Sequence, residues 1–159
     1  MADRVRDQYE DLPYPPRDPA DENRRLLTGT PSHILEIDHY VFAGARDWSR
    51  PFRALVAGGG TGDALIMLAQ QLRNLGCPAE LHYIDLSQAS RRIAEKRARV
   101  RRLDFIEFHT GSLLDAAEHG VFDYIDCCGV LHHLADPSAG FRALAAALSP
   151  EGGIGLMVY

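Results

Sequence analysis

Four glycines crowd into the five residues from Gly58 to Gly62, interrupted only by Thr61. The uninterrupted apolar run 54–57 precedes them, as expected of a strand buried on both faces. Apolar residues at helical spacing follow them: Leu65, Leu68, Leu72 and Leu75. In a parallel α/β sheet, a strand, a glycine turn and a helix place bare main-chain N–H groups and a helix N-terminus beside a ligand. Glycine suits the turn because a Cβ would block positive φ and keep the ligand off the main chain.

An aspartate follows the second predicted strand. Residues 81–84 form that strand and Asp85 ends it, about 20 residues beyond the glycine turn. A carboxylate has two acceptor oxygens, so an acid at this place can bind both hydroxyls of a ribose. Asp85 can instead cap the helix that follows, but Ser87 is itself a good N-cap residue. The pattern therefore favours the ribose role.

The glycine spacing distinguishes between classes of nucleotide site. The dinucleotide fingerprint G-x-G-x-x-G/A fails, because its third position is Asp63 when counted from Gly58 and Leu65 when counted from Gly60. What remains is G-x-G-x-G. This spacing resembles the first motif of the class I S-adenosylmethionine-dependent methyltransferases and disfavours a nicotinamide dehydrogenase.

The resemblance extends over about residues 53–159, and the string FDYIDCCGVLHHLADP, residues 122–137, is similar to the fourth motif of small-molecule methyltransferases. It implies that Asp85 binds the ribose, Leu86 lies near adenine, and Gly129 lines the methionine part. The implied cofactor-binding residues are Ala57, Gly58, Gly59, Gly60, Gly62, Asp85, Leu86, Ser112, Leu113, Cys128 and Gly129. Two residues depart from the family. Ser112 stands where Asp is more usual, and Val56 replaces an acid that helps to hold the methionine amino group.

The alternation of strands and helices predicts an α/β fold with helices on both faces of a parallel sheet. The resemblance implies a Rossmann-like three-layer sandwich with strand order 3-2-1-4-5 and no terminal antiparallel strands. The last predicted strand, residues 153–159, would then be an exposed apolar edge, and a homodimer through that edge is expected. Either the chain is a fragment of a longer protein or the fold closes in another way.

The chain divides into a polar, proline-rich arm (1–30) and a methyltransferase-like domain (31–159) that opens with a cap helix (31–44). Ser32 is the expected N-cap of that helix. The arm is either loosely attached or folded over the ligand mouth, with Tyr14 near the ligand. Further helices are expected at 64–75, at 87–102 and from Asp136, with strands at 105–108 and 122–128.

The composition of the chain limits the kinds of binding partner that are expected. The chain has 159 residues, 46% of them hydrophobic, which suits one domain. A net charge of −5 disfavours general binding to nucleic acid or anionic membranes. The basic helix 87–102 is the one feature that favours RNA as the methyl acceptor, although such helices usually form a solvated outer layer.

There is no secretory signal and no apolar run of about 20 residues. Three cysteines without a disulfide pattern indicate a cytoplasmic protein.

The leading hypothesis is methyl transfer from S-adenosylmethionine to a small molecule, leaving S-adenosylhomocysteine. An activated methyl group needs mainly alignment and exclusion of water, which fits the lack of a catalytic triad in the sequence. His132 is the candidate general base, followed by Tyr14 and His39. The pair His132-His133 does not predict a metal site, because adjacent side chains point different ways. The alternative is a cofactor-binding or truncated regulatory domain without turnover.

Overall fold

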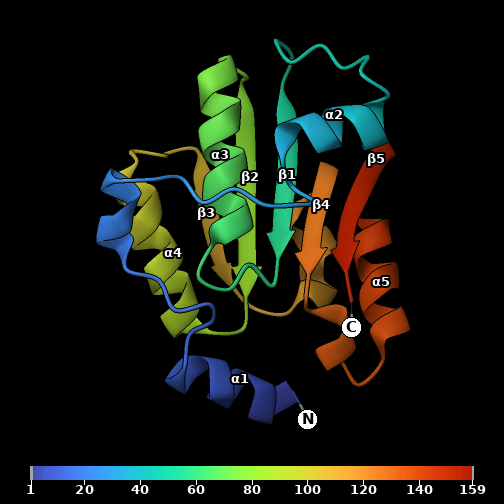
Figure 1. The fold of residues 1–159 in the computed structure, drawn as a ribbon. Helices are drawn as coiled ribbons and strands as arrows, with labels where there is room; N and C mark the ends of the chain where they lie inside the picture. Colours follow the sequence, from blue (N-terminus) through green and yellow to red (C-terminus); the bar gives the residue numbers. More distant parts are fainter. Residues whose placement is uncertain (1, 159) are drawn as a thin grey trace.

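A computed structural model describes residues 2–158 (Figure 1). Five parallel strands form one sheet in the predicted order, β3-β2-β1-β4-β5. The strands are β1 (Phe52–Ala57), β2 (Ala79–Asp85), β3 (Ile106–Thr110), β4 (Phe122–Cys128) and β5 (Leu148–Met157). The α/β class expected from the alternation of elements and the Rossmann-like strand order implied by the resemblance are therefore both confirmed.

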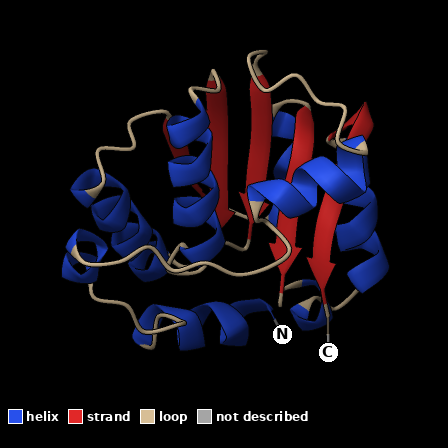
Figure 2. Ribbon diagram, turned by 45° about the horizontal axis from the view of Figure 1, so that its top comes forward, coloured by secondary structure: helices blue, strands red, loops and turns tan. Residues whose placement is uncertain are grey.

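Helices cover both faces of the sheet (Figure 2). One face packs against α2 (Ile34–Phe42), α3 (Asp63–Leu75) and α4 (Gln88–Val100), and the other packs against the 3₁₀ helices η2 (Leu113–His119) and η3 (Leu131–His133) and against α5 (Pro137–Ala146). Successive residues of β1 alternate between the two cores: Val56 joins the first, and Leu55 joins the second. Each large aliphatic side chain buried in this way stabilises the fold by about 1.5–3 kcal/mol.

The N-terminal segment, residues 2–33, runs around the carboxyl ends of the strands. Helix α1 (Ala2–Asp11) lies across those ends, and η1 (Pro19–Asn23) packs beside α4 (Figure 1). The arm is therefore not loosely attached. It folds over the carboxyl ends of the strands, where ligands of such sheets bind.

Several element boundaries differ from the sequence predictions, most of them by one or two residues, and three cases follow. Helix α2 begins at Ile34 with His33 as its N-cap, because the side chain of Ser32 turns inward and is fully buried. Strand β3 begins one residue later than expected and extends to Thr110. Strand β5 begins at Leu148 rather than at residue 153, because an irregular register against β4 accommodates the Pro-Glu-Gly-Gly stretch within the strand.

The outer edge of β5 is apolar, as expected. Leu156 is 38% exposed, Met157 is 43% exposed and Val158 is 58% exposed. Tyr159, the last residue of the predicted strand, lies outside the described residues. The homodimer through this edge stays a prediction. Within residues 2–158, no helix combines the length and apolar character needed to cross a bilayer.

Candidate functional site

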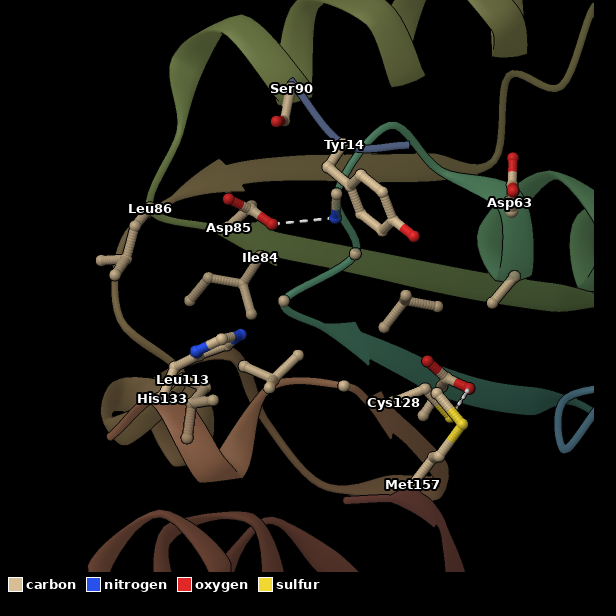
Figure 3. A pocket seen from close by; sticks show the side chains of 18 of the residues that line it. Tyr14, Asp63, Ile84, Asp85, Leu86, Ser90, Leu113, Cys128, His133 and Met157 are labelled. Atoms are coloured by element: carbon tan, nitrogen blue, oxygen red, sulfur yellow. Dashed lines mark hydrogen bonds between the residues drawn. The ribbon is translucent and has the colours of Figure 1, made fainter. Parts of the chain in front are cut away.

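A cavity of about 1150 Å³ opens at the carboxyl ends of β1, β2 and β4 (Figure 3). Ten of the sequence-predicted site residues line it: Gly58, Gly59, Gly60, Asp85, Leu86, Ser112, Leu113, Cys128, Gly129 and His132. Tyr14 of the N-terminal segment also lines it. These residues come from distant parts of the chain, and the switch point between β1 and β4 brings them together, as it does for ligands of open α/β sheets.

Three predicted residues lie elsewhere. Ala57 is fully buried among the apolar residues under the sheet. Gly62 precedes α3 with φ +98°, and a Cβ there would lie 2.9 Å from the Cβ of Ala94, so its role is close packing against α4. His39 is exposed on α2 and packs against Tyr40 with ring centroids 4.7 Å apart.

The glycine turn and Asp85 meet directly. The Gly60 N–H donates to Asp85 Oδ2 at 2.8 Å (Figure 3), and the Tyr83 hydroxyl donates to the Gly60 carbonyl at 2.6 Å. A Cβ on Gly60, where φ is +52°, would lie 2.6 Å from the Tyr14 carbonyl. The turn therefore needs glycine both for its left-handed conformation and for the close approach of the N-terminal segment.

Asp85 is held by the main chain. Its Oδ1 accepts from the Ser87 N–H at 2.8 Å, while the Ser87 side chain caps α4, as expected. Burial raises the pKa of Asp85, and hydrogen bonds from main-chain N–H groups oppose that rise. Each carboxylate oxygen already accepts one such bond and retains a lone pair for a ligand hydroxyl.

The N-terminal segment is bonded to both halves of the first βαβ unit. The Thr61 hydroxyl donates to the Pro15 carbonyl at 2.6 Å, and the Ser87 hydroxyl lies 3.0 Å from the Tyr9 carbonyl. Glu10 accepts from the Ala89 N–H at 3.0 Å. These bonds close one side of the cavity with main-chain atoms of residues 9–15.

A buried ion cluster fixes the same segment. Arg97 is 1% exposed and pairs with Glu22 of the segment and with Asp63 of α3, each at 2.7 Å. Arg17 also donates to Asp63, and Arg101 pairs with Glu22. Burial opposes ionisation of Asp63, but hydrogen bonds from Arg17 and Arg97 outweigh it and hold the Asp63 pKa below its usual value.

This cluster corrects the expectation that helix 87–102 is a solvated outer layer. The fully charged Arg97 lies inside the molecule because two carboxylates from other elements pair with it. On the outer side of α4, Arg91 bonds to Glu95 and Arg92 bonds to Glu10. Much of the basic character that favoured RNA is therefore neutralised within the molecule.

The loop after β3 and the end of β4 complete the lining. The Ser112 side chain caps η2 by accepting from the Leu114 N–H at 3.1 Å, and Leu113 is buried behind it. His132 and His133 follow β4, with ring centroids 4.1 Å apart. Burial and the neighbouring His132 lower the pKa of His133.

Sequence reasoning missed three acids that line the cavity, Asp63, Asp126 and Asp136, of which Asp126 is the buried one. Asp126 lies in the middle of β4, is 3% exposed and lines the cavity. Its Oδ2 accepts from the Ser32 hydroxyl and, at 3.5 Å, from the Cys128 thiol. A second carboxylate in this strand, between the apolar Ile125 and Cys127, was the available signal, because such a group is costly to bury without a purpose.

Comparisons with known proteins agree with this architecture. Residues 55–154 match a family described as methyltransferase domain. An uncharacterised protein of Synechococcus sp. is 38% identical over 153 residues, which cover 95% of this chain and 35% of that protein. The chain thus spans about a third of the length of this curated relative.

Solved structures share the fold. Coclaurine N-methyltransferase bound to N-methylheliamine and S-adenosylhomocysteine has a TM-score of 0.61 at 17% identity, covering 81% of this chain and 38% of that chain. The [4+2]-cyclase SpnF has a TM-score of 0.59 at 23% identity, covering 68% and 39%. Because the family match covers more than half of the sequence, the chain belongs to the methyltransferase domain family, whose class I members use S-adenosylmethionine as cofactor.

Proposed function

We propose that this chain binds S-adenosylmethionine in the cavity and transfers its methyl group to a small-molecule acceptor. The observation that carries the proposal is the 2.8 Å bond between the Gly60 N–H and Asp85. It joins a main-chain cradle to a carboxylate whose free lone pairs face the cavity, which suits one nucleoside held at two places.

Each lining residue takes a role set by its place. Asp85 accepts from the ribose hydroxyls, Leu86 and Leu113 pack against the adenine, and the Ser112 hydroxyl lies at its edge. The backbone of Gly58 and Gly129 lies beside the methionine part, since these two glycines follow β1 and β4 and both line the cavity.

The size of the cavity favours a small acceptor. Small-molecule pockets usually measure about 300–1,000 Å³, and this cavity of about 1150 Å³ has room for a cofactor and a second small ligand together. Coclaurine N-methyltransferase, which shares the fold, binds both kinds of ligand.

The bound cofactor supplies an activated methyl group. The chain's own residues align the acceptor and exclude water, with the N-terminal segment as the cover. An acceptor that carries a proton must lose it during transfer, and His132, which lines the cavity, is the residue we assign to take it.

Calorimetric titration with S-adenosylhomocysteine tests the site. Asp85→Ala is expected to weaken binding at least about 100-fold, because hydrogen bonds from two hydroxyls to a charged acceptor are lost. Asp104→Ala removes an exposed acid between α4 and β3 and is the matched control, with no expected change. Equal affinities of the two variants would show that the nucleoside binds elsewhere.

A turnover assay distinguishes an enzyme from a binding domain without activity. The second possibility is tested because the chain matches only 35% of the length of its relative. Release of S-adenosylhomocysteine is measured with amine, hydroxyl and carbon acceptors in turn. Turnover with one class identifies the acceptor chemistry. Tight cofactor binding without turnover across all three classes favours the binding domain.

A further inference from the structure

Val56 and Asp126 are register partners on adjacent parallel strands, β1 and β4. Partners in register carry their side chains to the same face of the sheet, and neighbouring strands lie about 4.8 Å apart. Val56 occupies the position where related methyltransferases have an acid. Asp126 therefore places a carboxylate on the strand next to Val56 and on the same face of the sheet.

No charged partner of Asp126 is found among the side chains of residues 7–158, which are those that the structure describes. Its own side chain is 3% exposed and lines the cavity. Among those residues it takes part in no salt bridge, and its side-chain partners are Ser32 and Cys128. Figure 3 shows the bond from the Cys128 thiol at the cavity wall. Because a buried carboxylate is costly without a charged partner, a cationic ligand at this position would supply what the protein does not.

The neighbouring donors favour the ionised form of Asp126. The Ser32 hydroxyl donates to it, and the Tyr124 hydroxyl lies 3.1 Å from Ser32 and 3.3 Å from the Pro31 carbonyl. Both side-chain bonds reach Oδ2, and Oδ1 receives no hydrogen bond from the described side chains, residues 7–158. Burial raises the Asp126 pKa, whereas the hydroxyl and thiol bonds act in the opposite direction.

We propose that Asp126 accepts a hydrogen bond from the α-ammonium group in the methionine part of the cofactor. It would thereby take the role of the acid that Val56 replaces in this chain. This proposal rests on the proposed function. Asp85 and Asp126 then hold opposite ends of one ligand, the ribose hydroxyls and the amino group. A cationic amine on the methyl acceptor offers the same chemistry, so the test must work in the absence of any acceptor.

Two ligands isolate the amino-acid part of the cofactor. S-Adenosylhomocysteine carries its amino group and carboxylate, and 5′-methylthioadenosine has the same nucleoside and sulfur without them. In calorimetric titrations, Asp126→Asn is expected to weaken S-adenosylhomocysteine about 10- to 100-fold, the usual effect of losing a hydrogen bond to a charged group. The affinity for 5′-methylthioadenosine is expected to stay within about twofold, since that ligand does not reach Asp126.

Asp104→Asn is the matched control. Asp104 is exposed between α4 and β3 and does not line the cavity. The variant removes the same charge away from the cavity and is expected to change neither affinity. Thermal unfolding of both variants verifies that they are folded at the titration temperature.

The outcomes separate the two proposals. If the unmodified protein binds neither ligand, the proposed function fails, and this inference fails with it. If both ligands bind and Asp126→Asn weakens neither, or weakens both equally, only the role of Asp126 is overturned. A loss that appears solely in KM for an amine acceptor overturns it as well and places the cation on the acceptor.

Discussion

Two of the carboxylates that line the cavity, the half-buried Asp85 and the buried Asp126, are held by different parts of the molecule. Asp85 on β2 takes its hydrogen bonds from the main-chain N–H groups of Gly60 and Ser87. Asp126 on β4 takes its side-chain bonds from Ser32 and Cys128. The first arrangement follows from the path of the main chain. The second depends on which side chains stand nearby, and Ser32 belongs to the N-terminal segment.

The proposed site has a nucleoside end at Asp85 and an amino end at Asp126, and the difference shows how each end depends on the rest of the chain. In the proposed site, Asp85 takes its bonds from main-chain groups next to it, while the loop after β3 and residues 9–15 complete the lining around it. The end at β4 is complete only when residues 2–33 are packed in place, because Ser32 must reach Asp126. The orientation of Asp85 therefore follows from the main chain of the β1–α3–β2 unit, whereas the ion cluster that attaches the N-terminal segment also supports the proposed contact at Asp126.

Arg97→Met breaks this attachment and has the largest expected effect on stability. It is expected to lower the free energy of unfolding by about 3–5 kcal/mol, because it leaves the buried Glu22 with one fewer cationic partner and Asp63 likewise. Urea unfolding followed by circular dichroism measures the change. The control is Arg99→Met on the same helix, whose side chain is 79% exposed, with an expected change below about 0.5 kcal/mol. Similar losses in the two variants would contradict a structural role for the cluster.

Local chemistry explains why part of the molecule could be predicted. The glycine turn, the place of Asp85 at the end of β2 and the Ser87 cap depend on residues close together in sequence and on the order of strands, and the structure has all three there. The ribose-binding role of Asp85 stays a prediction. The bond between Ser32 and Asp126 joins residues 94 apart, and the bond between Arg97 and Glu22 joins residues 75 apart. Nothing in local periodicity identifies such partners.

The same reasoning explains the two helix errors. Ser32 has the side chain of an N-cap, but its bond to a buried acid replaces that role, and His33 caps α2 instead. The arginines of α4 follow the pattern of a solvated helix, yet the helix turns Arg97 toward two carboxylates from other elements. In each case a long-range partner outweighs the local preference.

Lowering the pH tests the ion cluster that attaches the N-terminal segment, because it protonates Asp63, a carboxylate of that cluster. Its pKa is held below the usual value in the folded protein, so its contribution to stability is fully present above the unfolded pKa of about 3.9. The contribution is lost as the pH falls through the folded pKa. The difference in unfolding free energy between the unmodified protein and Asp63→Asn is therefore expected to be constant above about pH 5 and to shrink below about pH 4. Urea titrations across that range measure it, and a difference that does not vary with pH would mean that Asp63 is not ionised in the cluster.

Ser32→Ala is the mildest change and the most specific test of the amino end. Asp126 keeps its charge but loses the hydroxyl that orients it, so the affinity for S-adenosylhomocysteine is expected to fall about 2- to 10-fold, less than in Asp126→Asn. The affinity for 5′-methylthioadenosine should not change, because Asp85 keeps its main-chain bonds. Ser49→Ala, in an exposed loop beside Asp47, is the control for a serine hydroxyl bonded to a carboxylate away from the cavity. Equal weakening of both ligands by Ser32→Ala would show that Ser32 supports the packing of the N-terminal segment as a whole, and the two ends of the site would then not be held independently.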